Sequence, residues 1–243
     1  MHTLRRYAWS AVIVALPLAG VARTSHAQSV AAEAPAAVNP PAPELTPDAV
    51  QKQLAQVNAA TDLDATAKAS ALDFYQKALA ELDRAAAQAT QAAAFKTAAE
   101  QAPSELRVVR RALDAPADSA PPEVDADTSL AEFETGLAQA QTELNQAQED
   151  LTRLEAEPTR RADRRLKIPA QIDEAGNKLE DVKKQLSAAP PADEPKVLTA
   201  ARQVFLRARQ QALTQEIASC TSELESYNAE DVLLPKRRDL ALR

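Results

Sequence analysis

Glycine, histidine, cysteine and aromatic residues are scarce in this chain of 243 residues, and each shortage removes a class of protein or site. There are 3 glycines, 2 histidines and 1 cysteine, and aromatic residues make up 3% of the sequence. Phosphate-binding loops need closely spaced glycines, so Walker-type and dinucleotide-binding sites are excluded. A single cysteine cannot form an intramolecular disulfide, so no such bridge holds the fold together.

The first 27 residues have the pattern of a secretory signal peptide. Arg5 and Arg6 precede an apolar stretch, and small residues up to Ala27 fit the subsites of a signal peptidase. The alternative is an uncleaved membrane anchor, but the apolar stretch of roughly 15 residues is shorter than the roughly 20 that span a bilayer. We therefore predict that residues 1–27 are a signal peptide, cleaved after Ala27, and that the chain is exported.

Cleavage would also change the chemistry that the chain can support. His2 and His26 both lie in the leader, together with three of the 28 basic residues and none of the 35 acidic ones, so the formal net charge falls from −7 to −10. Binding to phosphates requires clustered positive charge, so no nucleic-acid partner is expected. Catalysis by a histidine base or a Ser-His-Asp triad is excluded with the histidines.

Proline-rich stretches divide the rest of the chain. Residues 28–46 are rich in alanine and proline and are predicted to be a disordered linker, because they hold little apolar surface to bury. Helical spacing predicts a helical region at 47–114, in which Thr46 caps the first helix and Pro103 interrupts a later one. Residues 115–128, rich in proline and aspartate, are predicted to be a loop.

The clearest pattern is a heptad repeat that follows Ser129. Its apolar residues alternate spacings of three and four, as in an a/d coiled-coil seam; they are Leu130, Phe133, Leu137, Ala140, Leu144, Ala147, Leu151 and Leu154. A second seam contains Ile172, Ala175, Leu179, Val182 and Leu186. Because Pro158 is expected to end the first helix, we predict that 129–189 forms an antiparallel coiled-coil hairpin with Leu144 buried in it.

Residues 190–243 are predicted to form a long helix and the start of another. The long helix runs from about Lys196 to Tyr227, and its apolar stripe drifts by one residue midway, which indicates contact with more than one neighbour. Pro235 sits where a new helix would begin, and the ending is interpreted as truncated. The predicted fold class is all-α, with elongated antiparallel helical hairpins or coiled coil and no β-sheet.

Two basic clusters are candidates for binding. The first contains Arg160, Arg161, Arg164, Arg165 and Lys167. It could contact anionic lipid headgroups or an acidic partner, but we favour a solvated turn at the hairpin tip, where the arginines complement a helix dipole and pair with nearby acids. The second contains Lys236, Arg237 and Arg238, and is ordinary for the start of an amphipathic helix.

The remaining candidates for chemistry are neighbouring carboxylates and the single thiol. The carboxylate pairs are Glu132 with Glu134, Glu155 with Glu157, and Asp193 with Glu194. We assign them solvated structural roles, because carboxylate-pair or Ser-Lys chemistry needs a cleft that thin hairpins rarely provide. Cys220 has helical spacing with its apolar neighbours and is interpreted as a small apolar residue, an intermolecular disulfide being the alternative. We predict no enzyme, no cofactor and no metal site.

Three groups of residues together resemble a known family, and this resemblance covers roughly residues 47–243. The family is the N-terminal periplasmic region of large bacterial mechanosensitive channels of the potassium-efflux type, often called the mechanosensitive channel porin domain. The groups are Ala102-Pro103-Ser104-Glu105-Leu106 followed by Val109 and Leu113; Ser129-Leu130 at the start of the heptads; and Glu225-Ser226-Tyr227 with Leu233-Leu234-Pro235 and Arg237-Arg238-Asp239.

The resemblance implies a periplasmic helical scaffold beside the inner membrane, attached to a channel that opens under osmotic tension. Its expected partner is the rest of that channel, which supplies the transmembrane helices and the pore. Homo-oligomerisation and peripheral contact with the membrane surface are left open. The alternative is a free-standing periplasmic coiled-coil adaptor that binds an envelope protein, and a reading frame that continues past Arg243 into hydrophobic segments would favour the channel.

Overall fold

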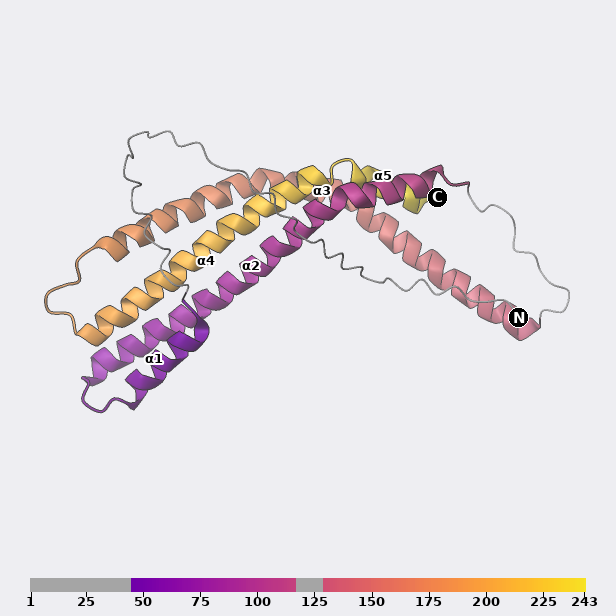
Figure 1. The fold of residues 1–243 in the computed structure, drawn as a ribbon. Helices are drawn as coiled ribbons and strands as arrows, with labels where there is room; N and C mark the ends of the chain where they lie inside the picture. The colour runs from indigo at the N-terminus through magenta and orange to yellow at the C-terminus, as the bar shows by residue number, and fades with distance from the viewer. Residues whose placement is uncertain (1–44, 117–128) are drawn as a thin grey trace, which may run out of the picture. The chain divides into compact units, whose positions relative to one another are not determined.

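A computed structural model describes residues 45–116 and 129–243, and every regular element within them is an α-helix (Figure 1). The helices are α1 (Pro47–Ala59), α2 (Ala65–Asp114), α3 (Leu130–Ser187), α4 (Lys196–Ala229) and α5 (Leu233–Leu242). The predicted all-α class is confirmed. The predicted signal peptide at 1–27, and most of the linker at 28–46 and of the loop at 115–128, lie outside the described residues.

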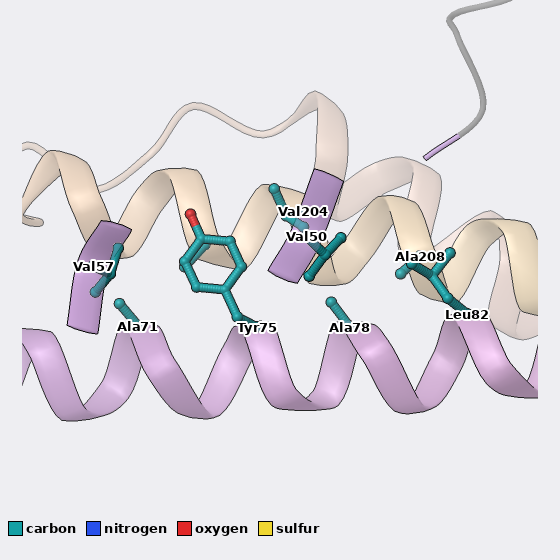
Figure 2. Close-up of a cluster of buried hydrophobic side chains, with 9 residues drawn as sticks. Val50, Val57, Ala71, Tyr75, Ala78, Leu82, Val204 and Ala208 are labelled. Atoms are coloured by element: carbon teal, nitrogen blue, oxygen red, sulfur yellow. The ribbon is translucent and has the colours of Figure 1, made fainter. Parts of the chain in front are cut away.

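Helices α1 and α2 form the first antiparallel hairpin. Thr46 accepts a hydrogen bond from the Ala49 amide at 3.3 Å, as predicted for the cap of α1, and Asp64 caps α2 by accepting from two backbone amides. The short connection returns the chain so that apolar residues of α1 pack against α2 and α4 (Figure 2). The buried members of this core are Val50, Val57, Ala71, Tyr75, Ala78, Leu82, Ala201, Val204 and Ala208.

Helices α4 and α5 run parallel to α2, one after the other. The ion pairs Arg84–Glu216 and Arg237–Glu105 each join residues that are 132 positions apart, so the register set between α2 and α4 continues into α5. At the end of this run, the Arg243 guanidinium donates to main-chain carbonyls in the last turn of α2. These carbonyls have no partner within their own helix, so Arg243 acts as a C-terminal cap.

The predicted breaks at proline are wrong. Helix α2, which has 50 residues, continues through Pro103. Helix α3, which has 58 residues, continues through Pro158 and Pro169, so 129–189 is not a hairpin. A proline inside a helix removes one backbone hydrogen bond and costs about 3 kcal/mol. Packing can offset that cost in α3 because the heptad spacing of three and four crosses the proline without a break, in Leu154, Pro158, Arg161, Arg165 and Ile168.

The two predicted seams have different environments. Ala175 and Val182 of the second seam pack against Leu206 and Leu213, so α4 folds back along α3 as the second antiparallel hairpin of the fold. From Leu130 to Ala147 the first seam has no such neighbour among the described residues, whereas Leu151 and Leu154 are half-buried. Leu144 is 51% exposed, so its predicted burial is wrong. The reason is that the helix expected to cover it is the continuation of α3 itself.

Helix α4 contacts more than one neighbour, as its drifting apolar stripe predicts. Ala201 and Ala208 lie in the core shared with α1 and α2, whereas Leu206 and Leu213 lie in the core shared with α3. Across the described ranges, 45–116 and 129–243, no helix is both long enough and apolar enough to cross a membrane.

Candidate functional site: a buried arginine–carboxylate layer

Charged residues occupy the heptad positions in the middle of α3. Counting Leu130 as an a position, Arg161 falls at d and Arg165 at the next a, where a coiled coil normally places apolar side chains. The Arg161 side chain is only 12% exposed. Burying a cation costs several kcal/mol unless an anion and hydrogen bonds compensate it. The fold must therefore supply carboxylates at this level of the helix pair.

The final part of α4 and the turn after it supply these carboxylates. The long-range pairs are Arg161 with Glu230, Arg164 with Glu223, and Arg165 with Asp231. Arg164 binds Glu223 through two parallel hydrogen bonds, Nε to Oε1 at 2.9 Å and Nη2 to Oε2 at 2.5 Å. Such bidentate pairs fix orientation as well as charge. They hold the middle of α3 against one end of α4.

Glu157 extends the layer along α3. It accepts two hydrogen bonds from Arg160 and one from Arg161, with distances from 2.6 to 2.7 Å. The bonds from Arg160, reinforced by Arg161, outweigh the opposing effect of burial and lower the pKa of Glu157 to about 2. Glu157 is therefore ionised at any pH near neutrality, and its negative charge compensates part of the positive charge of Arg160 and Arg161.

Tyr227 lies at the centre of the layer and is 2% exposed. The guanidinium carbons of Arg161 and Arg165 lie 4.9 and 6.0 Å from its ring centroid, and Phe95 of α2 meets the ring edge-on at 6.4 Å between centroids. Arg161 Nη1 and Arg165 Nε have no hydrogen-bond partner in the part of the chain that the structure describes. Cation–π attraction to the ring offsets part of that loss.

The titratable groups of α4 are tuned by the same packing. Burial would raise the pKa of Glu223, but hydrogen bonds from Arg164 and Tyr227 more than compensate and lower it. Burial raises the pKa of Tyr227, and donation of its hydroxyl to Glu223 raises it further. Burial also raises the pKa of Cys220, with a smaller contribution from Glu223. The carboxylate is thus ionised and both neighbouring acids keep their protons near neutral pH.

The first basic cluster is therefore divided by the structure. Arg161, Arg164 and Arg165 are parts of the helix interface and not of a solvated turn, because the turn predicted at the hairpin tip does not exist. The expected pairing with a nearby acid is confirmed for Arg160 and Arg161, which both bind Glu157. The other acids that bind this cluster are distant from it in sequence. Lys167 is exposed.

The other predicted candidates are separate from the layer. Glu132 forms a capping box with Ser129 at the start of α3, and Glu194 accepts hydrogen bonds from Thr199 and Arg202. The remaining carboxylates of the predicted pairs are exposed; they are Glu134, Glu155 and Asp193. In the second basic cluster, Lys236 and Arg238 pair with Asp239, and Arg237 pairs with Glu105.

Cys220 is a buried residue of the α3–α4 interface, as its helical spacing predicts. It is 8% exposed and belongs to a core cluster with Ile168 and Tyr227. Sequence reasoning did not single out Glu223, Tyr227 or Glu230 as parts of a site. The only local signal was the motif around Tyr227, which carried a family resemblance but no statement about its contacts.

Residues 53–242 match a family model described as the mechanosensitive ion channel porin domain. The match covers well over half of the chain and includes every residue of the arginine–carboxylate layer. The chain belongs to this family. The resemblance inferred from the sequence is thus confirmed, and the family is one of channel domains rather than of enzymes. No curated protein and no solved structure matches the chain.

Within this porin-domain chain, the arrangement of the layer suits mechanical attachment. Four arginines face four carboxylates on α3, on α4 and in the turn after α4, so the local charge is balanced; the carboxylates are Glu157, Glu223, Glu230 and Asp231. The Arg161–Glu230 pair is buried and the Arg164–Glu223 pair is largely so, and salt therefore screens these two less than surface pairs. Arg160 and Asp231 are more than half exposed, so their pairs are screened more. The layer can therefore fix the position of α3 along α4.

Proposed function

We propose that this chain is a non-catalytic, periplasmic helical scaffold that regulates a mechanosensitive ion channel during osmotic adaptation. The observation that carries the proposal is its membership of the porin-domain family of such channels over residues 53–242. The proposal assigns the conducting pore to another part of the channel and gives this region a modulatory role. Its partner in that role is the rest of the channel.

Two features of the fold support a scaffold. Helices α2 and α3 have 50 and 58 residues, which corresponds to lengths of about 75 and about 87 Å at 1.5 Å per residue. The arginine–carboxylate layer holds α3 to α4, and Phe95 connects α2 to the same Tyr227 ring. A displacement of one helix is thereby passed to the others through contacts that resist sliding.

The location in the periplasm is supported by the leader. Residues 1–27 have the charged start, apolar stretch and small-residue end of a secretory signal peptide. Export would place the helices on the outer side of the inner membrane, next to the channel they regulate. Fusion of residues 1–60 to alkaline phosphatase, which is active only after export, should give an active enzyme.

The regulatory role requires different contacts with the closed and open channel, because a domain can shift an equilibrium only by the difference of its interaction energies with the two states. The test is patch recording under suction from a mechanosensitive channel that carries this region. Deletion of residues 47–243 should change the tension threshold or the rate of inactivation and leave the unitary conductance unchanged. The chain alone should give no tension-gated current.

A point variant sharpens this test. Glu223→Ala leaves Arg164 without its buried partner and should shift the threshold in the same direction as the deletion, whereas exposed Glu225→Ala should not. Identical threshold, inactivation and conductance in the deletion would contradict the regulatory role. The free-standing periplasmic adaptor would then be the better interpretation.

A further inference from the structure

The N-terminal part of α3 presents an apolar stripe that nothing in the described residues covers. Every residue from 129 to 149 is exposed, although its apolar residues keep the spacing of a helix interface. Leu130 is 74%, Leu137 71%, Leu144 51% and Phe133 42% exposed. We call this set, with Ala140 and Ala147, the free stripe. Contiguous apolar surface of this kind marks interaction sites on proteins.

The free stripe belongs to the same heptad rows that α3 uses for packing farther along its length. Its a and d rows continue in register to Ile168, Ala175 and Val182, which are 0%, 3% and 3% exposed against α4. These heptad rows are therefore buried by α4 over their second half, whereas no described residue covers their first half. An a/d seam is complementary to the seam of another helix, so the missing partner of the bare half is a helix.

The charges beside the free stripe identify the chemistry of that helix. The flanking e and g positions hold the acids Glu134, Glu143, Asp150 and Glu155, and their other residues are glycine or glutamine. Residues 129–152 contain five acids and no lysine or arginine. A second copy placed on this stripe would find no opposite charge at any e or g position of the stripe. An anionic membrane would repel these acidic residues.

We propose that the free stripe binds an amphipathic helix whose leucine-rich a/d seam is flanked by lysine or arginine at its e and g positions. The partner's seam covers the exposed leucines, and its basic rows pair with the acidic rows of α3. In coiled coils, charge pairs at e and g positions determine which partner binds and in which orientation. This inference goes beyond the scaffold role and stands on the exposed residues of α3 alone. It holds whether or not the chain changes the gating of a channel.

The direct test uses the full 243-residue chain and two synthetic helical peptides of four heptads. Both peptides carry leucine at a and d, and they differ only in having lysine or glutamate at every e and g position. Binding is followed by fluorescence anisotropy of labelled peptide at low salt. The lysine peptide should bind at least about tenfold more tightly than the glutamate peptide, and added salt should weaken it.

Variants of the stripe separate binding from folding. Leu137→Asp combined with Leu144→Asp should reduce binding of the lysine peptide at least about tenfold, without changing the melting temperature, because both side chains are exposed. The control carries the same two charges at exposed c positions, in Gln139→Asp with Gln146→Asp, and should keep the affinity. Glu143→Lys with Asp150→Lys should shift the preference toward the glutamate peptide.

Three results would overturn the proposal. Equal affinity for the two peptides would remove the role assigned to the acidic rows. In sedimentation of the chain alone, a dimer that dissociates in the Leu137→Asp, Leu144→Asp variant would identify a second copy as the occupant. Flotation of the chain with phosphatidylglycerol vesicles, lost in the same variant, would identify a lipid surface instead.

Discussion

The Tyr227 hydroxyl donates to Oε1 of Glu223 at 2.5 Å, and the same carboxylate receives both hydrogen bonds of the Arg164 fork. The two donors come from different helices, since Tyr227 lies one turn after Glu223 on α4 and Arg164 lies on α3. Glu223 is therefore an ionised, buried carboxylate whose compensation depends on both contacts. Removal of either side should leave an uncompensated polar group in the interface.

Glu223→Ala should lower the free energy of unfolding by about 1.5–3 kcal/mol, because it removes the charge-assisted hydrogen bonds of the partly buried Arg164 guanidinium. Tyr227→Phe should cost about 1–3 kcal/mol, because removal of the hydroxyl takes away one of the two hydrogen bonds that Oε1 of Glu223 accepts. Urea denaturation followed by circular dichroism measures both. Glu225→Ala lies on the exposed side of the same helix and should have little effect. Equal stability of the Glu223 and Glu225 variants would show that the layer does not hold the fold.

Stability should fall on acidification over a window set by Glu157. Its pKa is lowered from the ordinary 4.5 to about 2, so the unfolded chain binds a proton more readily than the folded one. The contribution of this carboxylate is complete above about pH 4.5 and is lost as the pH falls toward 2. Thermal melts between these two pH values should show that the melting temperature falls less steeply with decreasing pH in Glu157→Gln than in the parent protein. Parallel curves for the two proteins would contradict the assigned pKa.

Aspartate substitutions should distinguish the two halves of α3. Leu144→Asp should change the free energy of unfolding by less than about 0.5 kcal/mol because the side chain is half exposed, and it should behave like Gln146→Asp. Ile168→Asp should cost several kcal/mol, because Ile168 is fully buried on the same heptad face. Strong destabilisation by Leu144→Asp would instead indicate a covered stripe and an antiparallel hairpin.

Cys220 should be protected from reagents in the folded protein. It is 8% exposed, and burial raises its pKa, so little thiolate is present near neutral pH. Iodoacetamide should modify it slowly in buffer and rapidly in urea, as mass spectrometry can follow. Rapid modification in buffer, or a disulfide-linked dimer on non-reducing gels of the native protein, would support the intermolecular disulfide that the sequence left as an alternative.

Local features of the sequence predicted the helices well. Thr46 forms the cap expected of it, and the spacing around Val182 correctly marked a packed face. These successes have a common basis, because capping and amphipathic spacing involve residues within a turn or two of each other. Prediction failed where tertiary packing outweighed a local preference, as at Pro103 and Pro158.

The arginine–carboxylate layer could be predicted only in part. The spacing that leads from Leu154 through Arg161 to Ile168 places these arginines on the packed face, and this signal was readable in the sequence. The identity of their partners was not, since Glu223 and Glu230 are 59 and 69 residues from the arginines they bind. No helical period relates such distant positions, and only the fold brings them together.

The two helices that run parallel, α2 and α4, bury mainly small side chains; these are Ala67, Ala71, Ala78, Ala85, Ala92 and Ala102 on α2, and Ala201, Ala208, Ala212, Ser219, Ser222 and Ser226 on α4. Alanine has no rotamer freedom to lose on burial, so each contact forms at little entropic cost, but each also removes little apolar area from water. Much of the cohesion between these helices is therefore shared in small amounts along their length, with larger contributions from Tyr75, Leu82 and Val204. Loss of one terminal turn should weaken the pair by a modest step, whereas loss of overlap over many turns should separate it.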